Sequence, residues 1–136
     1  MSNESPMKNK FVGYGVFLVV LVFGLMMTNS GVNKFLGYMP HPPLEPGARA
    51  LADAFTATGY MWPAIAIAEI IGGLLVLTKR FRAVGAILLM PITINVLLLD
   101  AFLNQGVLWI GITVFALNVI VLASQKHKLE GLFANA

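Results

Sequence analysis

One carboxylic acid, Glu69, lies in an otherwise apolar stretch of the sequence. The segment "PAIAIAEIIGGLLVL", residues 63–77, contains no other side chain that is charged or forms hydrogen bonds. Because desolvation of an ionised carboxylate is costly, such a group must face other protein groups, accept hydrogen bonds or stay protonated. Glu69 is therefore either a functional proton carrier or ligand anchor, or a permanently protonated structural group.

Two amides are the expected partners of Glu69. The acid stands about nine residues, or roughly 13 Å of helix, inside its apolar segment, which is near the centre of a bilayer. Asn95 and Asn118 fall at a similar depth in two later apolar segments. The sequence therefore predicts a buried cluster of Glu69, Asn95 and Asn118, with Thr93 and Thr113 as optional members.

Further polar residues lie near the outer ends of the apolar segments. Asn33 and Lys34 follow the first segment, Tyr60 begins the second, and Asp100 is close to the end of the third. We expect Lys34 and Asp100 to pair at the mouth of a cavity that leads to Glu69; the alternative is that both charges extend into lipid headgroups. The complete set of predicted ligand-binding residues is Glu69, Asn95, Asn118, Asn33, Lys34, Asp100 and Tyr60.

The sequence offers no basis for thiol or haem chemistry. It has no cysteine, which excludes disulfides and thiolate ligands within the chain. His41 and His127 are its two histidines, and both lie outside the apolar segments, so a buried haem has no evident axial ligand. We therefore predict no catalytic residue and no metal site, and we expect that the chain is not an enzyme on its own.

The elements that must position these residues are apolar segments of membrane-spanning length. Of the 136 residues, 58% are hydrophobic and only 11% are charged, and the mean hydropathy is +0.83. Backbone groups in lipid must satisfy their own hydrogen bonds, which favours helices. The predicted fold is all-α: one polytopic membrane domain over residues 1–136, an antiparallel bundle of four transmembrane helices at about residues 11–28, 60–78, 83–103 and 107–125.

The long connection between the first two segments has two parts. The prolines of "MPHPPLEPG", residues 39–47, are incompatible with an α-helix and predict an extended segment. The following "ARALADAFTATG", residues 48–59, has apolar residues at helical spacing and predicts a short interfacial helix. This helix either leads the chain into the second span or covers an outward-facing cavity.

The basic residues indicate orientation rather than a nucleic-acid surface. Seven of the nine Lys and Arg residues lie in segments that four spans place on one side: Lys8, Lys10, Lys79, Arg80, Arg82, Lys126 and Lys128. The positive-inside rule makes that side cytoplasmic. We expect a multi-pass protein of the bacterial inner membrane with both termini in the cytoplasm, in contact with lipid and not with nucleic acid.

Three stretches of the sequence resemble the DoxX family of small bacterial membrane proteins. They are "SGVNKFLGYMPHPP", "ATGYMWPAIAIAEIIGGLLVLTKRF" and "LMPITINVLLLDAFLN", and the resemblance extends over roughly residues 11–125. It implies a four-helix fold and an association with redox physiology, including quinone-linked oxidoreductases. Carried over by position, it points to Gly31, Asn33, Lys34, Gly59, Tyr60, Pro63, Glu69, Gly72, Gly73, Pro91 and Asn95.

The leading hypothesis combines the polar residues with this resemblance. We expect an inner-membrane protein that binds a small apolar or quinone-like molecule, or a lipid, in an outward-opening bundle cavity, as an accessory to a redox system. One alternative is a small proton-coupled transporter, because compact four-span transporters also contain a buried acid. The other is a structural subunit of a larger membrane complex. A redox-enzyme partner and a homo-oligomer are the two candidate assemblies.

Overall fold

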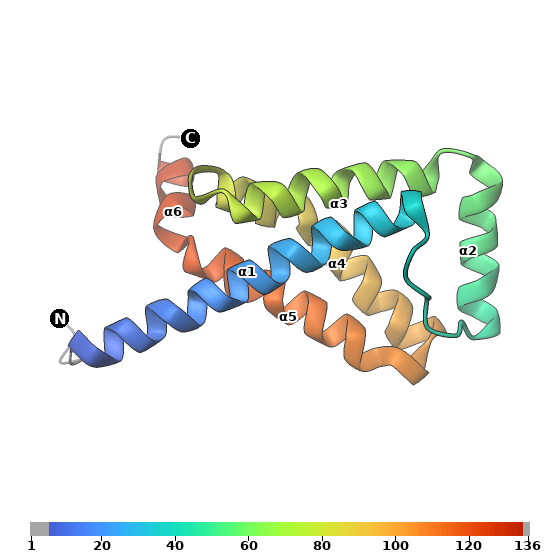
Figure 1. Ribbon diagram of the computed structural model, residues 1–136, viewed down its shortest axis with the longest axis horizontal. Coiled ribbons are helices and arrows are strands. Elements are labelled where there is room, and N and C mark those ends of the chain that lie inside the picture. The colour runs from blue at the N-terminus through green and yellow to red at the C-terminus, as the bar shows by residue number, and fades with distance from the viewer. Residues whose placement is uncertain (1–5, 135–136) are drawn as a thin grey trace.

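The computed structural model describes residues 6–134 and is all-helical over that range, as the sequence predicted. Figure 1 shows the long helices running roughly along the molecule and a shorter helix crossing them at one end. The elements are α1 (Pro6–Leu36), α2 (Pro46–Thr58), α3 (Met61–Leu77), the 3₁₀ turn η1 (Lys79–Phe81), α4 (Arg82–Leu103), the 3₁₀ turn η2 (Gln105–Val107), α5 (Leu108–Ser124) and α6 (Lys126–Ala134).

Three of the helices are long and apolar enough to cross a membrane. They comprise residues Asn9–Leu36, Lys79–Leu103 and Gln105–Ser124, each with a hydropathy of 2.2 to 2.3. The helix α3 has 17 residues and meets the same test only together with α2, from which it is bent by 96°. Residues 6–134 therefore contain three candidate spans, or four if the bent pair counts as one.

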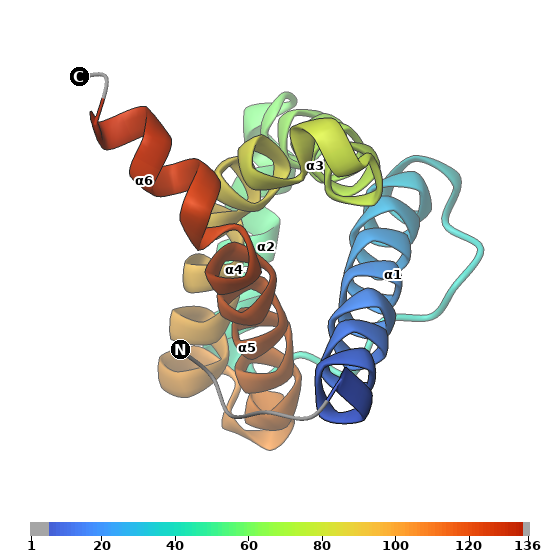
Figure 2. The ribbon, with the colours of Figure 1, turned by 90° about the vertical axis from the view of Figure 1, so that its left-hand side faces the viewer.

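Two boundaries differ from the sequence prediction. The first segment was expected to end near residue 28, but α1 continues to Leu36 and so carries the polar residues Asn33 and Lys34 on a helix. The basic tail also forms a helix, α6, which leaves the bundle at the end of α5 (Figure 2). Hydropathy detects neither feature, because both segments are too polar to be read as membrane helices.

The short helix predicted after the proline segment is present as α2. It begins at Pro46, where the missing N–H of proline costs no hydrogen bond. It ends at Thr58 and is capped by Gly59, whose φ of 76° is a left-handed conformation that favours glycine. The helix α2 packs on α3 and α4, and Figure 1 shows it crossing from the end of α3 toward the far ends of α4 and α5.

Close contacts at small residues fix the α1–α3 pair. A Cβ on Gly31 would lie 2.5 Å from the carbonyl oxygen of Ala66, and one on Gly73 would lie 2.7 Å from the backbone nitrogen of Thr28. Glycine has no side chain and therefore lets the two helix backbones approach this closely. In lipid such packing matters because no hydrophobic effect drives helices together. Because Lys34 follows Gly31 by about one turn and Glu69 follows Ala66 by about one turn, this contact places the two charged residues on facing surfaces.

Candidate functional site

A cavity of about 990 Å³ lies between the α1–α3 pair and α4, with α2 across one side of it. This volume is at the upper end of the range for pockets that bind small molecules, roughly 300–1,000 Å³. Most of its wall is aliphatic or aromatic. The lining residues are Lys34, His41, Pro42, Leu44, Leu51, Ala52, Phe55, Met61, Trp62, Ile65, Glu69, Ile92, Asn95, Val96, Leu98, Leu99, Asp100, Phe102, Leu103, Asn104, Val107 and Ile110.

The cavity wall contains an ion pair between α1 and α3. Lys34 Nζ donates to Glu69 Oε2 at 2.8 Å and to Ser30 Oγ at 2.9 Å. The Glu69 side chain is 4% exposed and that of Lys34 is 18% exposed. Burial of the pair gives strong mutual attraction and also makes either charge costly without the other. Glu69 therefore has a fixed cationic partner, and the ammonium group of Lys34 retains access to the cavity.

This pairing corrects two predictions. Glu69 was expected to cluster with Asn95 and Asn118, yet among the described residues its hydrogen-bond partner is Lys34. Lys34 was expected to pair with Asp100, and no ion pair joins them in the described part of the chain. The depth of a residue along its helix carries no information on which helix its side chain faces.

Asn118 belongs to the packed core and not to the cavity wall. Both Asn118 and Thr93 have no exposed surface, and the Asn118 amide lies 2.9 Å from Thr93 Oγ1. With the amide oriented to satisfy its neighbours, its nitrogen donates to the carbonyl of Ala86 at 3.1 Å, and its oxygen accepts from the Thr93 hydroxyl and from the N–H of Met90. Asn118 thus joins α5 to α4 and has no free group for a ligand.

Asn95 and Asp100 both line the cavity from α4. Asn95 Nδ2 donates to the carbonyl of Pro91, one turn earlier, at 3.0 Å. Asp100 is 5% exposed and lies against α5, where a Cβ on Gly111 would be 2.9 Å from its Oδ2. The close approach of α5 at Gly111 explains why this carboxylate is so well covered by protein.

Two predicted ligand residues lie elsewhere. Asn33 stabilises the turn after α1, since its Oδ1 accepts from the N–H of Met39 at 2.8 Å and its Nδ2 donates to the Met39 carbonyl at 3.4 Å. Tyr60 is 62% exposed at the bend between α2 and α3 and does not line the cavity. The structure therefore gathers Glu69, Lys34, Asn95 and Asp100 in one cavity and places Asn118, Asn33 and Tyr60 outside it.

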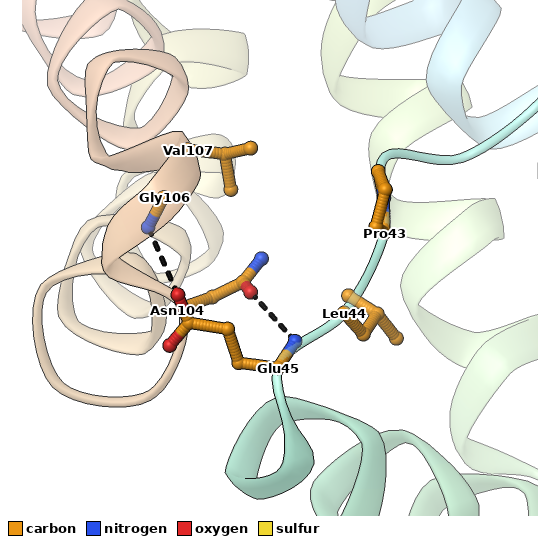
Figure 3. Close-up of a pocket in the computed structure, with 6 residues that line it drawn as sticks. All are labelled: Pro43, Leu44, Glu45, Asn104, Gly106 and Val107. Carbon is orange, nitrogen blue, oxygen red and sulfur yellow. Dashed lines mark hydrogen bonds between the residues drawn. The ribbon is translucent and has the colours of Figure 1, made fainter.

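The N-terminal end of α2 is tied to the α4–α5 turn by two hydrogen bonds. Glu45 donates its backbone N–H to Asn104 Oδ1 at 3.0 Å, and Glu45 Oε1 accepts the N–H of Gly106 at 3.2 Å. Figure 3 shows this reciprocal arrangement around a small pocket of about 290 Å³. We call Glu45, Asn104 and Gly106 the α2 anchor. No sequence signal indicated it, because its residues are about 60 positions apart.

The other end of α2 is fixed to α3 by aromatic packing. The rings of Phe55 and Trp62 meet edge to face, with centroids 5.4 Å apart and an interplanar angle of 74°. Trp62 Nε1 also donates to Thr56 Oγ1 at 3.0 Å. Both rings line the cavity, as does His41 from the proline segment. Neither Trp62 nor His41 was among the predicted ligand-binding residues, and both contribute to the cavity.

The arrangement can bind a molecule that is mostly apolar and has a polar group. The aliphatic and aromatic walls exclude water from an apolar body, while the ion pair, Asn95 and Asp100 lie on the walls to orient a polar head. Among the described residues no three His, Asp or Glu side chains gather as they would around a metal ion.

Comparison with known proteins gave one match. The family model described as DoxX matches residues 15–100, which is more than half of the chain. The matched range contains α1 from Gly15 onward, the proline segment, α2, α3 and α4 as far as Asp100. No curated protein and no solved structure matches the chain.

Proposed function

The chain belongs to the DoxX family, and from this premise we propose that it is a bacterial inner-membrane protein that holds a small apolar or quinone-like molecule in the cavity beneath α2. The observation that carries the proposal is the cavity of about 990 Å³, whose largely apolar wall contains the Lys34–Glu69 ion pair. Buried ionisable groups at membrane depth are costly, and they are retained mainly where they bind or transfer something.

The proposed topology has four spans, formed by α1, α3, α4 and α5. The 17 residues of α3 rise about 25 Å, which suffices for a bilayer core at the short end of the usual range. The 96° bend then lets α2 lie along the membrane surface. The exposed apolar residues on the outside of the long helices, among them Phe17, Leu25, Ile71 and Ile112, contact lipid in this topology.

The proposed orientation puts α2 and the cavity on the outer side. The start of α1, the turn η1 and α6 lie at one end of the molecule, and α2 lies at the other (Figure 1). The end opposite α2 carries most of the basic residues, and Lys128 of α6 donates to the carbonyl of Lys79 in η1 at 2.8 Å. Positive residues favour the cytoplasmic side, which supports cytoplasmic termini.

A quinone-like ligand fits the distribution of groups in the cavity. A ring carbonyl of the quinone would accept a hydrogen bond from the ammonium group of Lys34, which is the donor of the ion pair and its more exposed member. Its apolar tail would lie against the side chains of Leu99, Leu103 and Ile65. The further role as an accessory to a redox system, beside a partner enzyme or as a homo-oligomer, rests on analogy with the family.

The test is to fill the cavity or neutralise its acid and to measure ligand retention. Ala52→Trp adds a large side chain to the cavity wall, and Ala57→Trp adds the same side chain to the exposed surface of the same helix. We expect Ala52→Trp to abolish retention of a short-chain ubiquinone by the purified protein, Glu69→Gln to reduce it severalfold, and Ala57→Trp to leave it unchanged. Equal retention by the unmodified chain, Ala52→Trp and Glu69→Gln would refute the proposal.

A small proton-coupled transporter is the second candidate, because two carboxylic acids, Glu69 and Asp100, line the same cavity. Transport requires that the cavity also open to the other side of the membrane and that an acid exchange protons with solvent. A pH-driven flux of substrate in proteoliposomes, lost in Glu69→Gln, would favour this candidate. Ligand retention without any flux would favour simple binding.

A further inference from the structure

The charges on the cavity wall do not cancel. Lys34 and Glu69 are paired at 2.8 Å and offset each other. Asp100 is a second carboxylate on the wall, it is 5% exposed, and no described residue forms an ion pair with it. His41 also lines the cavity. With the acids ionised, the cavity therefore has one uncompensated negative charge.

A second polar side chain on the same helix, Asn95, can also accept a hydrogen bond. Asn95 uses one N–H of its amide to donate to the carbonyl of Pro91, and its amide oxygen can accept a hydrogen bond from a ligand. Asn95 precedes Asp100 by five residues on α4, and both line the cavity. Together they form a wall that accepts hydrogen bonds and attracts positive charge.

The aromatic pair on α2 and α3 adds a second, independent feature. Phe55 and Trp62 pack edge to face at 5.4 Å and line the same cavity. An indole face attracts a cation through its quadrupole, with an energy that increases when the site is desolvated. The surrounding wall is apolar, so a strongly hydrated inorganic ion would lose its water without sufficient replacement ligands.

From these features we propose that the cavity selects lipophilic organic cations, such as ammonium or phosphonium ions with apolar substituents, through Asp100 and the Phe55–Trp62 pair. This inference rests on the proposed use of the cavity for ligand binding, and it is independent of any redox role. It names a positive charge on the ligand, which an uncharged quinone lacks.

The test uses two probes of the same shape and opposite charge. The full chain in nanodiscs of zwitterionic lipid is titrated with radiolabelled tetraphenylphosphonium and, separately, with tetraphenylborate. We expect saturable binding of the cation and at least about tenfold weaker binding of the anion, a difference that corresponds to about 1.4 kcal/mol. Equal binding of the two ions, or no saturable binding of the cation, would overturn the proposal.

Variants then assign the charge. Asp100→Asn keeps the shape of the side chain and should weaken cation binding about tenfold, whereas Asp100→Glu should retain most of it. Asp53→Asn removes a carboxylate from the exposed surface of α2 and should have no effect. Cation binding that survives unchanged in Asp100→Asn would refute the assignment. If that variant does not fold, Trp62→Leu provides the second measurement, and unchanged cation binding in it would also count against the proposal.

The result is separable from the fate of the proposed function. Retention of a short-chain ubiquinone together with equal binding of the two tetraphenyl ions would leave the cavity as a ligand site and remove only its preference for cations. Loss of every ligand, including the ubiquinone, would show that the cavity is not a binding site at all.

Discussion

The helices α3 and α4 pack differently at the two ends of the bundle. Near η1 the helices are in close contact, since a Cβ on Gly85 would lie 2.7 Å from the carbonyl oxygen of Gly72. Toward α2 they separate, and the cavity lies between residues such as Trp62 on α3 and Leu103 on α4. Figure 1 shows the divergence, with α2 spanning the wide end. Close packing at the η1 end stabilises the fold, and the separation of the helices at the α2 end leaves a cavity.

The buried polar groups follow the same division. Between α4 and α5 the neutral Asn118–Thr93 pair has no exposed surface and satisfies its hydrogen bonds within the core. At the open end the charged Lys34–Glu69 pair faces a cavity. A neutral pair costs little to bury when it is fully hydrogen-bonded, whereas an ion pair costs more because both charges lose their hydration.

The largest expected effect comes from adding a methyl group at the packed end. Gly85→Ala places a Cβ against backbone atoms of Gly72 and Val76 that cannot move without shifting α3, and we expect a loss of about 2 kcal/mol or more in the free energy of unfolding. Gly13→Ala, where no atom lies within 4 Å of the new Cβ, is the matched control. Unfolding in mixed micelles measures both, and equal stabilities would contradict the close α3–α4 contact.

The second prediction concerns the ion pair at the open end. Lys34→Met leaves the Glu69 carboxylate buried without a partner, and we expect a loss of about 2 kcal/mol. Combining Lys34→Met with Glu69→Gln removes both charges and should recover more than half of that loss. The interaction energy from the double-mutant cycle is the measurement. Additive effects of the two single changes would show that the groups are not coupled.

The sequence predicted the elements well and their mutual orientation poorly. Long apolar segments identify α3, α4 and α5 to within about two residues, because hydropathy reports the solvent that each segment prefers. The extension of α1 to Leu36 was missed because its last two turns contain Asn33 and Lys34. Those side chains are satisfied by the turn at Met39 and by Glu69, which are contacts that no local pattern reveals.

The same distinction applies to the candidate site: several of its polar residues could be recognised from the sequence, but the directions in which they face could not. Glu69 was recognisable because a lone acid in an apolar segment needs a partner, and the small residues Gly31 and Ala66 determine that the partner comes from α1. Asn118 faces Thr93 on α4, a direction that its position along α5 does not reveal. The cavity itself depends on the 96° bend before α3 and on the α2 anchor, and both are properties of the assembled fold.

The smallest expected effect on stability, and the sharpest on access, comes from the α2 anchor. Glu45→Ala removes the hydrogen bond from Gly106 to Glu45 Oε1, which is exposed and contributes about 0.5–1 kcal/mol at most. The backbone hydrogen bond from Glu45 to Asn104 remains, so α2 stays folded but opens more often. A ligand would then enter and leave faster without a large change in the unfolding free energy.

The absence of cysteine from the sequence makes this measurable. Leu51→Cys introduces a single thiol on the cavity side of α2, and Ala57→Cys introduces one on its exposed surface. In the Glu45→Ala background, maleimide labelling of the thiol at position 51 should accelerate severalfold, while labelling at position 57 stays the same. Equal acceleration at both positions would mean that α2 unfolds instead of opening. No acceleration at position 51 would mean that the packing of Phe55 on Trp62, and not the α2 anchor, controls access to the cavity.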